Sequence, residues 1–307
     1  MSQQRISPTE AERVARTLEL AVTRRLDGLL RGQYLGVLPG PGWDVGEARS
    51  YIPGDDVRRI DWNLSARTDE VQVRDTIVEW ELEATLAVDL SPTIAFGTAL
   101  YEKRDLALAA AAAVGFLATK TGGRLGGVLL EAGGEVIVPQ RSGRRHVVGL
   151  IKQLAASRPA DGTGRSDLAA GLRSVGRIAR RRGLVCVISD FLADGAWERE
   201  LRALSQRHEV LAVEVVDPRE LELPDIGDVA FVDPASGERL TVATSNSELR
   251  ERYAAAAAKQ RLRIATAIAG AGASHLSLRT DRDWVREIVE FVALRRRIAV
   301  HRPGPSA

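Results

Sequence analysis

The chain has 307 residues, a formal net charge of +2 and 45% hydrophobic residues. This composition supports one large core with a smaller appendage, and it excludes a strong overall field that would attract nucleic acid or an anionic surface. The only cysteine, Cys186, lies in the apolar stretch LVCVIS, which excludes an intramolecular disulfide. The polar start lacks a signal-peptide core, and the longest apolar run, 106–118, is shorter than the ~20 residues of a membrane span. We therefore expect a cytoplasmic protein.

The first eighty residues predict a small module of helices and strands that leads into the first core strand of a larger domain. Apolar residues at helical spacing predict a helix over 8–31, and the glycines and prolines of GVLPGPGWDVGE then end any regular element. The pair Pro53-Gly54 suits a type II turn. A short helix is expected in DDVRRIDWNLSAR, and an alternating apolar pattern predicts a long strand over 70–88.

Beyond that strand, predicted helices and strands alternate to the end of the chain. Helices are expected over 102–120, 143–156, 167–182, 196–207, 247–269 and 282–297. Strands are expected over 184–188, 209–216 and 274–278, with hairpins over 124–139 and 229–244. This alternation predicts an α/β fold with a largely parallel sheet and helices on both faces.

Short oxygen-bearing side chains occur at three places next to the predicted strands. Asp89, Ser91 and Thr93 alternate after an apolar strand, Ser166 precedes a helix, and Asp190 follows a second apolar strand. In open α/β sheets, ligands bind outside the carboxyl ends of the strands. Oxygen donors without His or Cys suit Mg²⁺ or Mn²⁺. We therefore expect these five residues to form a divalent metal site.

The order of these residues resembles the metal-ion-dependent adhesion site (MIDAS) of von Willebrand factor A domains. Asp89, Ser91 and Thr93 match its first loop, Ser166 its second and Asp190 its third, although Thr93 replaces a serine and Ser166 a threonine. The resemblance implies that Ser91 and Thr93 coordinate the metal directly and that Ser166 joins in one state. Asp89 and Asp190 would act largely through waters, and an acidic side chain of a partner would complete the octahedron. It therefore implies a protein-binding module that is not an enzyme.

A second stretch, GEARSYIPGDDVRRIDWNLSARTDEVQVRD, covers residues 46–75. It resembles the signature of the prokaryotic domain-of-unknown-function 58 family, which reads Arg-Glu-Tyr-x-Pro-Gly-Asp-Asp followed by Arg-x-Ile-Asp-Trp. Ser50 stands where that family commonly has Glu. The family places this signature before a von Willebrand factor A-like domain and is commonly encoded beside MoxR-type AAA+ ATPases. The resemblance implies such an ATPase or its client as partner, in protein remodelling or maturation.

These two resemblances divide the chain into three parts. Residues 1–82 form the helix and β module with the signature, 83–300 the von Willebrand factor A-like (Rossmann-like) domain, and 301–307 a tail. Within the signature, we expect a turn held by Asp–Arg pairs, with Trp62 in a core; a docking surface for a partner is the alternative.

Other interpretations of the oxygen-bearing loops and of the charge pattern stay open. The side chains could merely cap their loops by bonding nearby backbone N–H groups. DLSPT also resembles the Asp-x-Asp-x-Thr loop of haloacid-dehalogenase-like phosphatases, with Asp89 as nucleophile, although Ser91 replaces their general acid. Residues 250–302 hold twelve Lys/Arg against five Asp/Glu, so this basic C-terminal segment could contact nucleic acid. No recognised nucleic-acid-binding motif accompanies it.

Overall fold

The structure is a computed structural model of the whole chain. It describes residues 8–22, 49–52, 57, 60, 62–68, 70–73, 83–120, 122–131, 133–157, 166–193, 196–232 and 237–300. The predicted turn at Pro53-Gly54, the end of the first predicted helix, residues 74–82 of the long predicted strand and the tail lie outside the described residues.

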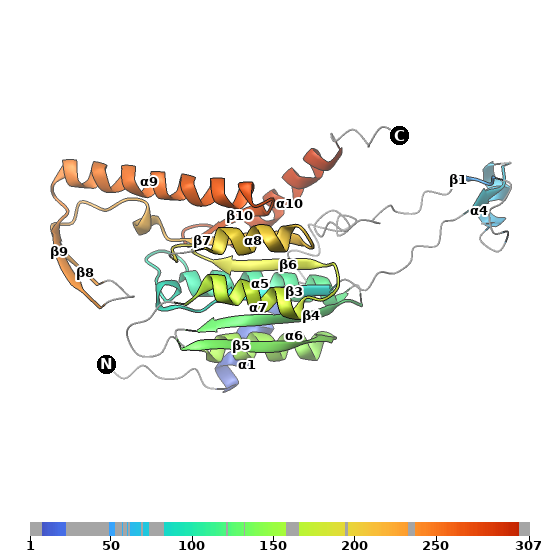
Figure 1. The fold of residues 1–307 in the computed structure, drawn as a ribbon, viewed down its shortest axis with the longest axis horizontal. Helices are drawn as coiled ribbons and strands as arrows, with labels where there is room; N and C mark the ends of the chain where they lie inside the picture. Colours follow the sequence, from blue (N-terminus) through green and yellow to red (C-terminus); the bar gives the residue numbers. More distant parts are fainter. Residues whose placement is uncertain are drawn as a thin grey trace.

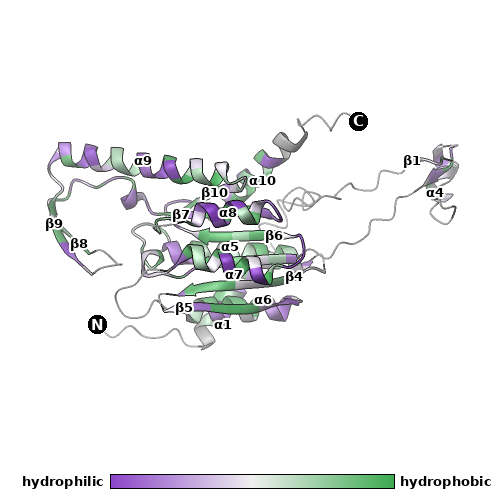
Figure 2. Ribbon diagram, viewed as in Figure 1, coloured by the Kyte–Doolittle hydropathy of each residue, from purple (hydrophilic) through white to green (hydrophobic). Residues whose placement is uncertain are grey.

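A six-stranded sheet forms the centre of the α/β domain, with strand order β10-β7-β6-β3-β4-β5 (Figure 1). The strands are β3 (Glu83–Asp89), β4 (Arg124–Glu131), β5 (Gly134–Ser142), β6 (Leu184–Ser189), β7 (Glu209–Val216) and β10 (Ser274–Arg279). Every neighbouring pair is parallel except β4–β5, which is an antiparallel hairpin. The inner strands β3, β6 and β7 are apolar almost throughout, as expected of parallel strands covered on both faces (Figure 2).

Helices cover both faces of this sheet and create two cores. The helices are α5 (Lys103–Lys120), α6 (Arg144–Ala156), α7 (Leu168–Ile178), α8 (Trp197–Ser205), α9 (Ser247–Gly270) and α10 (Trp284–Val300). Leu86 and Val88 of β3 pack with α5, α6 and α10, whereas Ala87 faces α7, α8 and α9. The prediction of a mostly parallel α/β sheet flanked by helices is confirmed. No helix within the described ranges is long and apolar enough to cross a membrane.

The first helix, α1 (Pro8–Leu20), packs against α6 and α5. Ala11 and Ala15 are buried in the same core as α5, because their small side chains allow close contact between helices. The predicted division at residue 82 places this helix in the N-terminal module, whereas the structure joins it to the α/β domain. What remains of that module within the described residues is one small unit.

This unit consists of β1 (Arg49–Ser50), α4 (Trp62–Thr68) and β2 (Gln72–Val73). The two strands pair antiparallel, and the N–H of Gln72 donates to Ser65 Oγ at 2.8 Å. Trp62 was predicted in a core but is 69% exposed. The reason is size, because a seven-residue helix and two two-residue strands cannot enclose an indole ring.

A second hairpin, β8 (Asp228–Val232) and β9 (Arg239–Ala243), forms its own two-stranded sheet. It lies beyond the carboxyl ends of the central strands, next to the start of α9 (Figure 1). The hairpin therefore adds a wall to the edge of the sheet at which the predicted metal ligands end their strands.

Candidate metal centre at the carboxyl ends of the strands

The first predicted ligands lie directly after strand β3. Asp89 ends the strand and is only 1% exposed. The N–H of Ser91 donates to Asp89 Oδ1 at 2.9 Å, a local bond that turns the chain at the strand end. The 3-10 turn η3 (Pro92–Ile94) follows, and the hydroxyl oxygens of Ser91 and Thr93 lie 2.9 Å apart. This loop thus places two hydroxyls side by side near a buried carboxylate.

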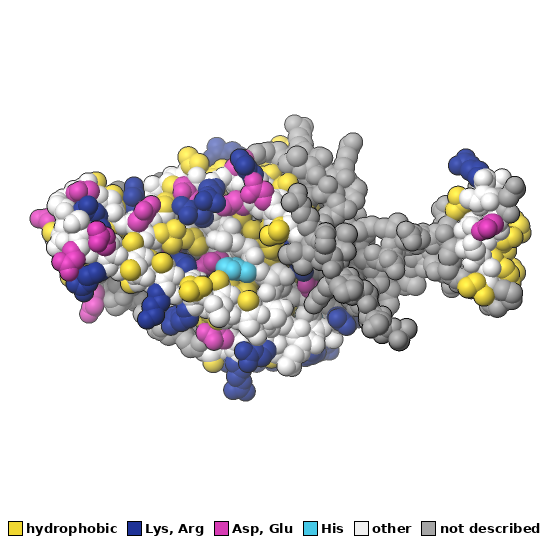
Figure 3. All heavy atoms as spheres, turned by 90° about the horizontal axis from the view of Figure 1, so that it is seen from above, with side chains coloured by type: hydrophobic (Ala, Val, Ile, Leu, Met, Phe, Trp, Pro, Cys, Tyr) yellow, Lys and Arg dark blue, Asp and Glu magenta, His cyan; other side chains and the backbone are white. Residues whose placement is uncertain are grey.

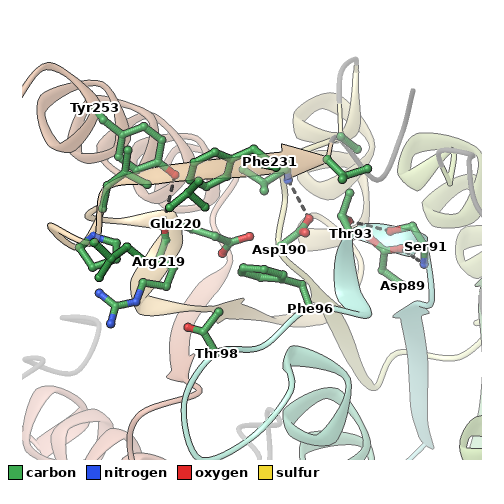
Figure 4. Close-up of a pocket in the computed structure, with 18 of the residues that line it drawn as sticks. Asp89, Ser91, Thr93, Phe96, Thr98, Asp190, Arg219, Glu220, Phe231 and Tyr253 are labelled. Carbon is green, nitrogen blue, oxygen red and sulfur yellow. Dashed lines mark hydrogen bonds between the residues drawn. The ribbon is translucent and has the colours of Figure 1, made fainter. Parts of the chain in front are cut away.

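Two further loops bring oxygen groups to the same carboxylate. Ser166, just before α7, donates its hydroxyl to Asp89 Oδ1 at 2.8 Å, and Ser189 at the end of β6 donates to Oδ2 at 2.7 Å. Asp190 follows in the third loop and is 1% exposed. The structure brings all five predicted ligands to one cavity: Asp89, Ser91, Thr93, Ser166 and Asp190. Figure 4 labels all of them except Ser166. Their role as metal ligands stays a prediction.

The loop after β6 holds Asp190 by an unusual backbone conformation. Phe191 has φ of 55°, in the left-handed region that bulky residues rarely adopt. Its ring is buried and packs on Trp197 with ring centroids 5.1 Å apart, and its N–H donates to Ser189 Oγ at 3.0 Å. The N–H of Leu192 donates to Asp190 Oδ1 at 3.1 Å. Burial of the ring and these bonds offset the local strain and fix the direction of the Asp190 carboxylate.

A buried lysine, missed by the sequence analysis, approaches Asp190 from within the protein. Lys103 at the start of α5 is fully buried, and its Nζ lies 2.9 Å from Asp190 Oδ2 and 2.6 Å from Glu220 Oε1. Burial alone would lower the pKa of Lys103, but the two carboxylates raise it above its usual value. Lys103 is not among the residues that line the cavity. It therefore neutralises Asp190 from behind and leaves the cavity side of the cluster open.

Asp89, in contrast, has hydrogen-bond donors but no cation. None of the described basic side chains forms an ion pair with it. Burial, followed by repulsion from the nearby Asp190 carboxylate, raises the pKa of Asp89 above its usual value, and the bonds from Ser189 and Ser91 only partly oppose this. A buried carboxylate without a counter-ion is costly, and a bound cation would relieve that cost.

Another group that the sequence analysis did not single out shapes the edge of the cavity. Asp217 and Glu220, at the ends of the sequence DPRE after β7, form a reciprocal capping box around the 3-10 turn η4 (Pro218–Glu220). Asp217 also accepts bonds from the hydroxyls of Thr98 and Thr280, both at 2.7 Å. Burial alone would raise the pKa of Asp217, but these hydrogen bonds lower it. The D-x-x-E spacing was a visible signal for this cap.

Replacing Asp217 with alanine is expected to lower the free energy of unfolding by about 3 kcal/mol. The change leaves the N–H groups of Thr98 and Arg219, which lie 2.8 and 2.9 Å from the carboxylate, without their acceptor. Urea unfolding followed by circular dichroism measures the loss. The Asp217→Asn variant keeps one acceptor oxygen, so its free energy of unfolding should fall clearly less than that of Asp217→Ala. Equal losses below 1 kcal/mol in both variants would show that Asp217 does not tie these loops together.

The donor set fits a small divalent cation. An octahedral Mg²⁺ site with bonds of about 2.0–2.1 Å has neighbouring ligand oxygens about 2.9 Å apart, and the hydroxyl oxygens of Ser91 and Thr93 have this separation. A carboxylate offers about four acceptor positions. Three donors already bind Asp89, from Ser91, Ser166 and Ser189. Little direct coordination is left to it, so binding through water is favoured.

Comparison with known proteins decides the family of this chain. A family model described as "Protein of unknown function DUF58" matches residues 47–263. The chain belongs to the DUF58 family. The resemblance read from the signature at 46–75 is thus confirmed.

The DUF58 protein also resembles several bacterial chains. It is 50% identical over 285 residues to "Uncharacterized protein Rv1480" of Mycobacterium tuberculosis, which covers 93% of this chain and 90% of that protein. A structure titled conserved hypothetical protein BatB, from Bacteroides thetaiotaomicron, is 14% identical, covers 70% of this chain and 99% of its own, and has a TM-score of 0.43. A von Willebrand factor type A structure from Catenulispora acidiphila is 12% identical to this chain and has a TM-score of 0.37. The match covers 73% of this chain and 43% of the other chain.

Proposed function

We propose that this DUF58 protein is a binding module that captures an acidic side chain of a partner protein through a divalent cation, Mg²⁺ or Mn²⁺. The hydroxyls of Ser91 and Thr93 would hold the cation directly. Asp89 and Asp190 would orient these hydroxyls and the surrounding waters, and Ser166 would support Asp89. When bound, the cation supplies a Lewis-acidic position for the incoming carboxylate. The protein's own contribution is to fix these oxygen atoms at the floor of a cavity.

The observation that carries this proposal is the uncompensated charge of Asp89. It is buried, close to a second carboxylate, and surrounded by hydroxyls from three loops. Among the described residues, Lys103 forms ion pairs with Asp190 and Glu220 and so balances their charge, but it forms none with Asp89. Because a buried carboxylate is costly unless it is protonated or paired, a cation at the Asp89 side of the cavity would stabilise its charged form.

The same contacts favour binding over hydrolysis. A nucleophilic aspartate must direct an oxygen at its substrate, whereas both Asp89 oxygens accept hydrogen bonds from Ser166 and Ser189. On the side shown in Figure 3, the described Lys/Arg and Asp/Glu side chains are intermixed and do not form a continuous basic surface. We therefore propose protein binding rather than phosphatase activity or nucleic-acid binding.

The family resemblance names the partner to test first. Immobilised full-length protein is expected to retain the MoxR-type AAA+ ATPase of the same organism in Mg²⁺ and to release it in EDTA, with recovery on adding Mn²⁺. Retention is measured by surface plasmon resonance. Capture that is indifferent to EDTA would overturn the metal-dependent binding. Absence of capture in either buffer would remove the ATPase as partner and direct the test to its clients.

A further inference from the structure

The metal-site residues occupy only one end of a larger cavity. The cavity has a volume of about 720 Å³, within the range of roughly 300–1,000 Å³ that is usual for ligand sites. Away from the oxygen atoms, its lining is mainly apolar. Six of these side chains come from five different segments of the chain: Phe96, Leu192, Leu223, Val229, Phe231 and Tyr253. The cation proposed above would fill only a small part of this volume.

Apolar side chains also remain exposed at the rim of the cavity. Ile226 is 65% exposed, Val232 is 54% exposed and Phe96 is 40% exposed, and all three line the cavity. Strand β8 thus continues the apolar lining out onto the surface. Contiguous apolar surface of this kind marks a contact with another molecule more often than scattered single residues do.

Arg219 provides a positive charge at the same cavity. It lies on η4, is exposed, and lines the cavity. Its backbone is fixed, because its N–H donates to Asp217 at 2.9 Å and its carbonyl accepts from the Tyr253 hydroxyl at 3.1 Å. Within the part of the chain that the structure describes, its guanidinium forms no ion pair or hydrogen bond. A guanidinium on a fixed backbone suits bidentate binding of a carboxylate.

Figure 4 shows Arg219 and the Ser91–Thr93 pair on opposite sides of Phe96 and Phe231. We propose that the cavity binds an extended segment of the partner in which bulky apolar residues lie between two acidic residues. One carboxylate would reach the cation at Ser91 and Thr93, the apolar side chains would cover Phe96 and Phe231, and the second carboxylate would bind Arg219. The first of these anchors rests on the proposed function, whereas the other two do not. Two separated anion positions favour a peptide over a fatty acid, which carries one carboxylate.

The test uses a phage-displayed library of random dodecapeptides selected on the full-length protein in Mg²⁺. The selected peptides are expected to share apolar residues flanked by two acidic residues. Affinity of the best peptide, measured by fluorescence anisotropy, should fall about tenfold or more in Arg219→Glu and in Phe231→Ser. Controls are Arg252→Glu and Leu262→Ser, two exposed positions of α9 that do not line the cavity. Both controls should bind like the parent protein.

The outcomes separate this inference from the proposed function. If EDTA abolishes peptide binding but Arg219→Glu and Phe231→Ser do not weaken it, the metal anchor stands and the peptide site proposed here is wrong. If those two variants lose binding and EDTA has no effect, the apolar and Arg219 anchors stand and the metal anchor fails. No enrichment, or enrichment of basic peptides, would overturn the inference. So would concentration-dependent dimers that Phe231→Ser abolishes, because a second copy would then occupy the cavity.

Discussion

Replacing Lys103 with methionine is expected to lower the free energy of unfolding by about 3–5 kcal/mol, the usual cost of removing one partner from a buried ion pair. Methionine keeps the length and the apolar stem of the lysine, so little packing is lost. It removes the ammonium group that lies 2.9 Å from Asp190 and 2.6 Å from Glu220. The carboxylates of Asp190 and Glu220 would then lie without the cation that now pairs with both of them.

The pH dependence of this loss follows from the pKa shifts of the pair. The raised pKa of Lys103 means that its contribution is complete below pH 10.5 and disappears only as the pH rises through that raised value. Burial alone would raise the pKa of Asp190, but Lys103 lowers it, so its contribution is present above pH 3.8 and is lost as the pH falls further. The difference between Lys103→Met and the parent should therefore be largest near neutral pH and smaller in acid and strong alkali.

Urea unfolding followed by circular dichroism measures this difference. The matched control is Lys152→Met, which breaks an ion pair with Glu12 whose two side chains are 37% and 55% exposed. Exposed pairs contribute about 0–1 kcal/mol, so the control should change little. If Lys103→Met were no more destabilising than Lys152→Met, Lys103 would not be clamped between the two carboxylates.

Replacing Asp89 with asparagine is expected to abolish divalent-cation binding without destabilising the fold. The amide oxygen can still accept from the N–H of Ser91 and the hydroxyl of Ser166, and the Ser189 hydroxyl can turn to accept from the new amide. The substitution also removes the buried charge that burial and Asp190 make unfavourable. Without metal, the free energy of unfolding should stay within about 1 kcal/mol of the parent value or increase.

Thermal unfolding in increasing Mg²⁺ measures the loss of binding. A ligand at 100 times its dissociation constant stabilises the folded state by about 2.7 kcal/mol, so the melting temperature of the parent should rise with Mg²⁺ and that of Asp89→Asn should not. Asp167→Asn is the control, because Asp167 follows Ser166 but its exposed carboxylate accepts from the N–H of Ala170 and pairs with Arg173 at 3.9 Å. A parallel rise in Asp89→Asn would mean that the cation binds elsewhere.

The sequence predicted the sheet and most helices because their patterns are local and strong. Apolar runs such as Leu184–Ser189 and the alternation of helices with strands determine a parallel α/β fold, whatever the details of packing. The approach of Asp190 to Asp89 follows from topology, since the parallel strands β3 and β6 end at the same edge of the sheet. Ser166 reaches this edge from the start of α7, the helix that precedes β6. These two levels of the structure could therefore be inferred before any coordinates.

Other features depend on contacts between distant segments and could not be inferred in this way. Lysines are rarely buried, and a positive charge opposes the dipole at the start of a helix, so nothing local marks Lys103 as the partner of Asp190. The packing of α1 on α6 likewise involves two helices more than a hundred residues apart. The residue type of Trp62 predicts burial, but the described part of its small unit is too small to bury the ring, which is 69% exposed.

The most direct measurement of the proposed metal site is a Mn²⁺ titration of the full-length protein, with free Mn²⁺ followed by electron paramagnetic resonance. Oxygen atoms of Asp89, Ser91 and Thr93 at one cavity predict a single bound Mn²⁺ per chain, displaced by Mg²⁺ and absent in Asp89→Asn. The proposed metal site would be contradicted if the parent protein bound no Mn²⁺, or if the parent and Asp89→Asn bound it equally.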